Sequence, residues 1–198
     1  MDKERFEKQL AFILEADKEK NILRQTHLSG YTRQENDAEH AWHIAMMIWL
    51  LKEYANEEFD VGKAMMMALI HDIVEIDAGD TYAYDTKGLS TQKERESKAA
   101  DRIFGLLPSD QQEELKALFE EFEEGKTPEA KFARTMDNLQ PILLNDSNNG
   151  ADWRAHGVNK TQVLNRQKSS QLGSEEIWEF AKSLVERNVA KGNIKEDI

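Results

Sequence analysis

Apolar residues recur along the chain at the three- and four-residue spacing of helices that bury one face. Phe6, Leu10 and Ile13 show this spacing near the N-terminus, and Phe132 and Leu139 show it again later in the chain. No segment alternates convincingly between apolar and polar residues, as half-buried strands do. The pattern therefore predicts an all-α fold.

Caps and breakers divide this pattern into successive helices. Residues 41–51 are apolar on nearly all sides, which predicts a central buried helix with Asp37 as its N-cap and with Trp42 and Trp49 in the core. Residues 21–36, just before it, are polar and read as an irregular loop. We expect helices at residues 6–14, 37–51, 60–78, 91–107, 109–124, 127–143, 161–172 and 175–191.

Length and composition narrow the class of protein. The 198 residues favour one domain over residues 1–198, and the absence of cysteine excludes disulfides and thiol nucleophiles. The net charge of −12 opposes binding to a nucleic acid polymer, and a small phosphorylated ligand would need nearby cations or a metal. No leader pattern or apolar run of membrane-spanning length is evident, so we expect a soluble cytoplasmic protein with no membrane partner.

One stretch, residues 67–81, breaks the apolar pattern abruptly. An apolar run ends at His71 and Asp72, and Glu75 follows at positions i+4 and i+3 from them, on the same face of a helix. Gly79 then ends the helix and Asp80 returns toward the same place. Charged groups entering a buried helix end must be paired or bind a metal, because an isolated buried charge is costly to desolvate.

Four residues at the ends or edges of apolar helices are candidate metal ligands: His40, His71, Asp72 and Asp137. Two imidazoles and two carboxylates suit a divalent cation and leave positions open for water and substrate. The sequence thus predicts one divalent ion, which the residue types leave open among Mn, Co, Mg, Zn, Ni and Fe.

The order of these residues resembles the motif of the HD-domain metal-dependent phosphohydrolases, which is a His, then a His-Asp pair, then a distant Asp. The resemblance covers roughly residues 23–145 and implies a helical HD-domain fold with a buried metal site. We expect the helices within residues 160–192 to pack on that core.

Glu75 and the Gly79-Asp80 pair resemble the branch that contains bacterial 5′-deoxynucleotidases. That resemblance implies a catalytic role for the Glu, sugar contact for the Asp and phosphate binding by an upstream Arg, for which Arg24 is the nearest match. Those deoxynucleotidases carry Trp after the Arg, whereas Gln25 stands here, so sugar selectivity and exact substrate do not transfer.

These residues predict a phosphomonoesterase acting on (deoxy)nucleoside 5′-monophosphates. Metal ions lower the pKa of bound water and polarise phosphoryl oxygens. Glu75 would orient or deprotonate that water, while Arg24 and Lys87 would bind the phosphate. Asp80 would either position a sugar hydroxyl or manage the leaving-group proton.

Several alternatives remain open at this point. His43 is either a further ligand or a hydrogen-bonded core residue. The absence of His between Ile73 and Met136 favours one metal over two. Nucleoside triphosphates or cyclic dinucleotides are alternative substrates, and a binding protein without turnover is an alternative class.

Apolar residues of the last helix, including Trp178 and Phe180, suggest a homodimer. Four residues either line a base pocket or serve packing: Tyr82, Tyr84, Trp153 and His156.

Overall fold

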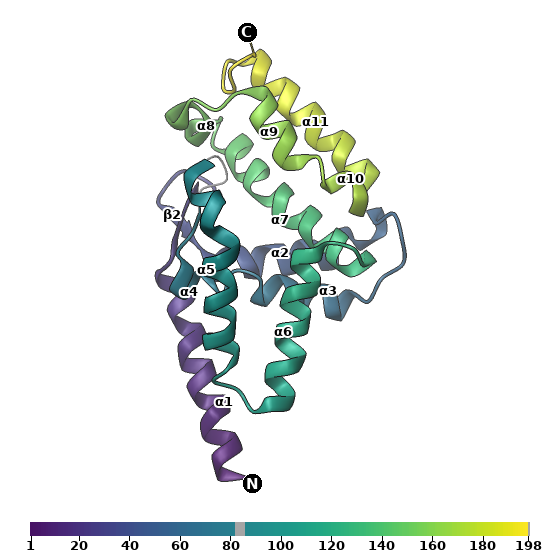
Figure 1. The fold of residues 1–198 in the computed structure, drawn as a ribbon. Coiled ribbons are helices and arrows are strands. Elements are labelled where there is room, and N and C mark those ends of the chain that lie inside the picture. The colour runs from purple at the N-terminus through teal and green to yellow at the C-terminus, as the bar shows by residue number, and fades with distance from the viewer. Residues whose placement is uncertain (82–85, 198) are drawn as a thin grey trace.

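The structure, a computed structural model, describes residues 1–81 and 86–197. Its regular elements are nearly all helices (Figure 1), which confirms the predicted all-α class. In chain order they are α1 (Lys3–Ala16), the 3-10 helix η1 (Asp17–Asn21), β1 (Leu23–His27), β2 (Gln34–Asn36), α2 (Asp37–Leu51), the 3-10 helix η2 (Lys52–Tyr54), α3 (Val61–Ile70), α4 (Glu75–Ala78), α5 (Thr86–Phe104), α6 (Ser109–Glu124), α7 (Pro128–Ser147), α8 (Ala151–His156), α9 (Lys160–Gln167), α10 (Ser170–Gly173) and α11 (Glu175–Ala190).

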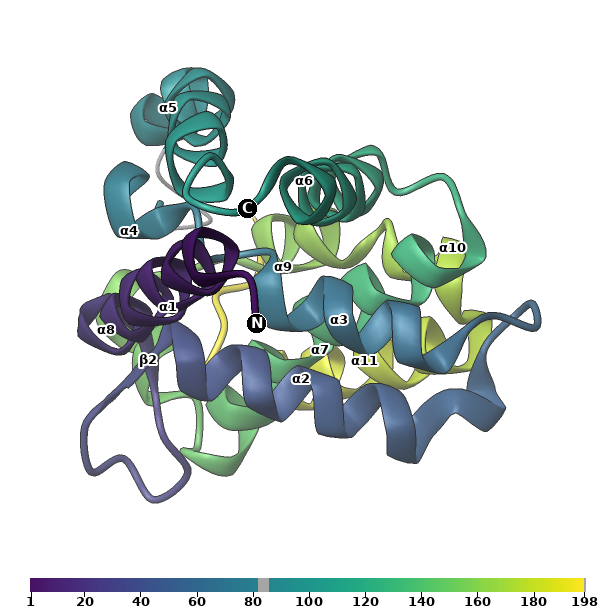
Figure 2. The ribbon, with the colours of Figure 1, turned by 90° about the horizontal axis from the view of Figure 1, so that it is seen from below.

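Helix α7 lies at the centre of the fold. It begins where the sequence predicts, with Thr127 as N-cap and Pro128 in the first turn. Phe132 and Met136 pack in a core shared with α2 and α3, while Ile142 packs with residues of α8, α9 and α11. Figure 2 shows α2 and α3 side by side, with α7 next to both. Burial of each such side chain contributes about 1.5–3 kcal/mol.

Helices α5 and α6 cover the turn that follows α3. Ile73 and Val74 of that turn pack against Ile103 and Phe104 of α5 in a second core. Helix α5 starts at Thr86, earlier than the cap expected at residue 91, and α6 ends at the left-handed Gly125 as expected. The apolar flank of the His-Asp pair is thereby shielded from water.

The prediction that residues 21–36 are irregular is wrong. Strands β1 and β2 pair there in antiparallel fashion, with Leu23 opposite Asn36 and His27 opposite Gln34. Both strands are short and polar, so they lack the alternation by which half-buried strands are found. Asn36, rather than Asp37, caps α2.

The expectation of a helix buried on all sides is also wrong for α2. Ile44 and Ile48 are fully buried against neighbouring helices, but Trp42 is 63% exposed and Trp49 is 53% exposed, so neither is a core residue. Only one side of α2 meets α3 and α7. We call the opposite stripe the outer α2 face; it consists of Trp42, Met46, Trp49 and Leu50.

Helices α9, α10 and α11 pack on α7 (Figure 1). The helix expected over residues 161–172 is divided into α9 and α10, and α11 is capped by Ser174 as expected. Among the described helices, none combines the length and apolar character that crossing a membrane requires.

Candidate metal centre and phosphate site

The four residues proposed as metal ligands meet at one point, although they come from three separate helical segments. His40 lies in the first turn of α2, His71 and Asp72 directly follow α3, and Asp137 lies midway along α7. The Nε2 atom of His40 lies 3.0 Å from Oδ1 of Asp137 and 3.9 Å from Oδ2 of Asp72. The Nε2 atom of His71 lies 3.1 Å from the same Asp72 oxygen and 3.8 Å from the same Asp137 oxygen.

These donor atoms fit a single divalent ion. Ligands bonded to one ion at about 2.0–2.2 Å lie roughly 3–4 Å from one another, which is the spacing seen here. The buried Nε2 atom of His71 is close to both carboxylates but makes no well-aligned hydrogen bond with either, and a metal bond would satisfy it. His40, His71 and Asp72 form a group of close potential ligand atoms.

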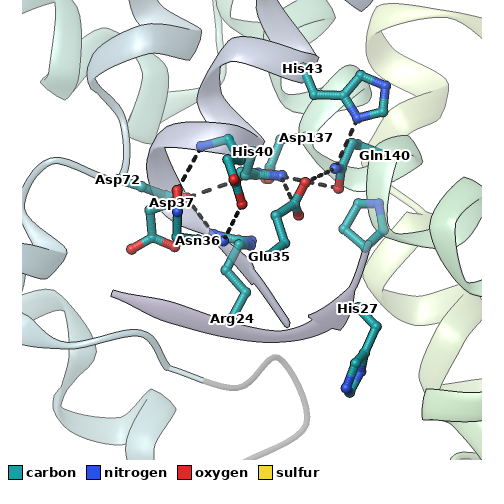
Figure 3. A network of polar contacts seen from close by, with 12 residues as sticks. Arg24, His27, Glu35, Asn36, Asp37, His40, His43, Asp72, Asp137 and Gln140 are labelled. Atoms are coloured by element: carbon teal, nitrogen blue, oxygen red, sulfur yellow. Dashed lines mark hydrogen bonds and ion pairs between the residues drawn. The ribbon is translucent and has the colours of Figure 1, made fainter. Parts of the chain in front are cut away.

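Each imidazole is oriented through its other nitrogen. Nδ1 of His71 donates to the carbonyl oxygen of Ala68 at 2.9 Å, one turn earlier in its own segment. Nδ1 of His40 lies 3.1 Å from Oε1 of Gln140 on α7 (Figure 3). Both Nε2 atoms therefore face the shared centre.

The local charges act on the two imidazoles in opposite directions. Burial and the charge of Arg24 lower the pKa of His40 to about 4, so its ring is neutral. Burial alone would lower the pKa of His71 too, but Asp72 and Asp137 together raise it well above its ordinary value. A metal ion would have to replace that proton on His71, because a coordinating ring must be neutral.

Arg24 reaches the metal ligands from β1, a strand that the sequence does not predict. Its Nη1 donates to Oδ2 of Asp72 at 2.6 Å and to Oδ1 of Asp37 at 3.0 Å (Figure 3). Asp37 is fully buried, and burial together with Asp72 raises its pKa to about 7. Sequence reasoning treated Asp37 only as a helix cap; its partnership with Arg24 depends on the unpredicted strand β1.

Glu75 and Asp80 line the same cavity as His71 and Asp72. Glu75 begins α4 and is 6% exposed, and burial followed by the charges of Asp72 and Asp37 raises its pKa to about 11. Asp80 is partly buried, and burial raises its pKa as well. The expected continuous helix from His71 to Glu75 is absent, because α3 ends at Ile70 and a turn precedes α4.

A cavity of about 750 Å³ opens over this centre. Small-molecule sites typically occupy about 300–1,000 Å³. Its wall includes six of the proposed site residues, which are Arg24, His71, Asp72, Glu75, Asp80 and Asp137. The cavity is therefore large enough for a small phosphorylated molecule beside the donor atoms.

The cavity wall also contains a cation that sequence reasoning missed. Nη2 of Arg166, on α9, lies 3.5 Å from Oδ2 of Asp137, and the side chain is 45% exposed. Nothing in the sequence distinguishes this Arg from other surface cations on amphipathic helices. Only the packing of α9 on α7 brings it to the site.

The remaining residues considered from sequence divide into three groups. His43 contacts Nε2 of Gln140 through Nδ1 at 3.2 Å, which matches the hydrogen-bonded alternative. Trp153 is buried in the core around α7 and α11 and also lines the cavity, as does His156. The side chain of Lys87, together with Tyr82 and Tyr84, lies outside the described residues.

Comparison with known families identifies the class of protein. Residues 16–178 match a family model described as HD domain. The chain therefore belongs to the HD-domain family, in agreement with the resemblance carried by His40, the His71-Asp72 pair and Asp137.

Individual relatives agree with this assignment. The human "5'-deoxynucleotidase HDDC2" is 32% identical over 111 residues, which cover 56% of this chain and 53% of the relative. The "5'-deoxynucleotidase hdd1" of Schizosaccharomyces pombe is 29% identical over 118 residues, which cover 57% and 58%. The chain thus spans about half the length of these curated relatives.

Solved structures match over a greater length. A "Predicted metal-dependent phosphohydrolase" from Magnetospirillum magnetotacticum is 47% identical with a TM-score of 0.92, covering 96% of this chain and 95% of the other. A "Conserved hypothetical protein" from Pyrococcus furiosus is 26% identical with a TM-score of 0.63, covering 90% and 99%.

Proposed function

We propose that this protein is a metal-dependent phosphohydrolase that converts (deoxy)nucleoside 5′-monophosphates to nucleosides and phosphate. The observation that carries the proposal is the convergence of His40, His71, Asp72 and Asp137 beside a cavity whose wall includes Arg24 and three of these four residues. These four residues would bind one divalent ion, and Mn, Co, Mg, Zn, Ni and Fe all remain candidates. The names of the human and yeast relatives and of the Magnetospirillum structure support this class of activity.

When bound, a divalent ion supplies an activated water and polarises a phosphoryl oxygen. Glu75 would accept a proton from such a water, and its buried carboxyl, which lines the cavity together with His71 and Asp72, supports this role. The negative charge of Asp72 contributes to the high pKa of Glu75. A cation bound at Asp72 would therefore lower the pKa of Glu75. It would favour the ionised form of Glu75, which is the form that acts as a general base.

The phosphate would be bound by cations from two sides of the cavity. Arg24 approaches from β1 and Arg166 from α9, and both guanidiniums suit phosphate oxygens because each offers several N–H donors. Lys87 is proposed as a third cation on the basis of the sequence. These cations would offset the repulsion between an anionic phosphate and a chain whose net charge is −12.

Asp80 is proposed to act on the nucleoside end of the substrate. It lies partly buried in the cavity wall, where it would either position a sugar hydroxyl or transfer a proton to the leaving oxygen. Gln25 also lines this cavity. The side-chain amide of Gln25 can hydrogen-bond a sugar hydroxyl. The preference between ribose and deoxyribose is therefore tested by comparing the two kinds of nucleotide as substrates.

A phosphate-release panel tests the proposal. The protein, stripped of metal and reloaded separately with Mn²⁺, Co²⁺, Mg²⁺, Zn²⁺, Ni²⁺ or Fe²⁺, is assayed on ribo- and deoxyribonucleoside monophosphates, triphosphates and cyclic dinucleotides. Metal-dependent release from monophosphates is the expected result. Preference for triphosphates or cyclic dinucleotides would replace the proposed substrate class, and tight nucleotide binding without release would indicate a binding protein.

We further propose one domain over residues 1–198 that assembles as a homodimer through the outer α2 face. Its two tryptophans, Trp42 and Trp49, are more than half exposed, and such apolar stripes commonly mark protein interfaces. The four residues of the stripe are themselves uncharged, and the nearby cation Lys52, 4.2 Å from the ring of Trp49, would offset part of the repulsion between two copies of a chain with net charge −12. A cytoplasmic location stays a prediction from sequence.

A further inference from the structure

Two side chains on α7, one helical turn apart, contact opposite nitrogens of the same imidazole. Asp137 lies 3.0 Å from Nε2 of His40, and Gln140 lies 3.1 Å from Nδ1 of the same ring. Residues at i and i+3 share a helix face, which is why both reach α2. His40 and Gln140 are fully buried, so water does not compete for these contacts.

The orientation of the Gln140 amide is fixed by its other partners. Nε2 of Gln140 lies 2.6 Å from Oε1 of Glu35, on β2, and 3.2 Å from Nδ1 of His43. A carboxylate can only accept hydrogen bonds, so the NH₂ group must face Glu35. The carbonyl oxygen of Gln140 then necessarily faces His40 (Figure 3).

This arrangement places the proton of His40 on Nδ1 whenever a cation, in place of a proton, lies between Nε2 and Asp137. A carbonyl oxygen only accepts, so Nδ1 of His40 must be the donor. The neutral ring then has its lone pair on Nε2, the atom that lies within 4 Å of both Asp137 and Asp72. That tautomer is the one that can bind a cation at the shared centre.

The two imidazoles of the centre are therefore oriented in different ways. His71 donates to the backbone carbonyl of Ala68, which no side-chain substitution removes. His40 depends on a side-chain amide from α7, and that amide depends on a carboxylate from β2. Such outer contacts to metal-binding imidazoles commonly tune metal affinity.

We infer that Gln140 and Glu35 are positioning residues that fix the tautomer and ring orientation of His40 for a divalent metal ion. The inference rests on the proposed metal centre and adds the two residues that prepare one of its ligands. Glu35 acts on His40 only through Gln140, because Oε2 of Glu35 lies 3.8 Å from Nδ1 of His40, too far for a hydrogen bond.

The first test measures metal affinity rather than turnover. Gln140→Leu removes the acceptor for Nδ1, and we expect Mn²⁺ and Co²⁺ to bind about 10–100-fold more weakly by calorimetry, with a changed visible spectrum of the Co²⁺ form. The matched control is Asn188→Leu, which removes a buried amide on α11 that is hydrogen-bonded to Asp146, near the end of α7, and to Leu184 of α11. It should lower thermal stability without changing metal affinity.

A charge exchange separates positioning from simple packing. Gln140→Glu alone places two carboxylates side by side and should weaken metal binding and stability. Combining it with Glu35→Gln restores one acceptor facing His40 and one amide behind it, so metal affinity should return to within about tenfold of wild type. This pair of variants also serves if Gln140→Leu does not fold.

The outcomes are distinguishable. If folded Gln140→Leu binds Co²⁺ with wild-type affinity and spectrum, or if the double exchange binds no better than Gln140→Glu alone, the positioning role is refuted. If the wild-type protein itself binds none of these metals, the proposed function fails instead.

Discussion

The guanidinium of Arg24 lies 2.6 Å from the carboxylate of Asp72, so a side chain proposed for phosphate binding directly contacts one proposed for the metal. The same nitrogen also donates to Asp37. Both carboxylates are buried or nearly so, with Asp37 fully buried and Asp72 13% exposed. Arg24 therefore has a structural role that precedes any contact with substrate.

Replacing Arg24 by Gln should destabilise the metal-free protein. Removing one partner of a buried ion pair leaves uncompensated charge and typically costs about 3–5 kcal/mol. Urea unfolding in the presence of a chelator measures the change, and Arg166→Gln is the control because its side chain is 45% exposed. Equal stabilities for the two variants would show that Arg24 does not neutralise Asp37 and Asp72.

Substitution of His71 or Asp72 by Ala should abolish stoichiometric metal binding. Each change removes one of four donors, and metal that binds only the folded state stabilises it by mass action. Elemental analysis should find less than one ion per chain, and the melting temperature should no longer rise with added Mn²⁺. Full metal occupancy in either variant would contradict the ligand assignment.

Substitution of Glu75 by Ala should reduce turnover while leaving metal content intact. General acid–base assistance typically contributes about 10²–10⁴-fold, so the catalytic constant should fall within that range. Nucleotide affinity should be retained, because removing a carboxyl relieves repulsion of an anionic phosphate. Undiminished turnover in metal-loaded protein would remove Glu75 from the mechanism.

Glu19 should make stability depend on pH. Burial, followed by the charge of Asp72, raises its pKa from 4.5 to about 8. The folded protein therefore retains this proton where the unfolded chain has lost it, and the resulting stabilisation, full below pH 4.5, disappears as pH rises toward 8.

Glu19→Gln removes this titration. In chelator, its melting temperature relative to wild type should rise steadily between about pH 5 and pH 8. Glu7→Gln, which changes an exposed carboxylate, should show a constant difference. A constant difference for Glu19→Gln as well would mean that this carboxyl titrates normally in the folded protein.

The proposed dimer can be disrupted at one position. Trp49→Glu places charge in the outer α2 face and should yield monomers by light scattering at micromolar concentration, without loss of helical content. Phe180→Glu, at a 44% exposed position on α11, should remain dimeric. If Phe180→Glu dissociates the dimer and Trp49→Glu does not, the interface lies on α11.

Helix type and much of the candidate site follow from local sequence. The caps at Asp60, Thr127 and Ser174 begin helices where expected, because capping depends on residues within one turn. The His71-Asp72 pair at the end of an apolar run was identifiable for a similar reason: buried charge requires compensation wherever the chain packs.

Tertiary structure alone decided which surfaces meet. The sequence of α2 is apolar on nearly all sides, and only the placement of α3 and α7 determines that Trp42 and Trp49 face outward. Likewise, Arg166 and Gln140 look like ordinary helical residues until α9 and α7 bring them beside Asp137 and His40. Periodicity specifies a helix and its possible faces, whereas contacts between residues about 100 positions apart depend on how the whole core packs.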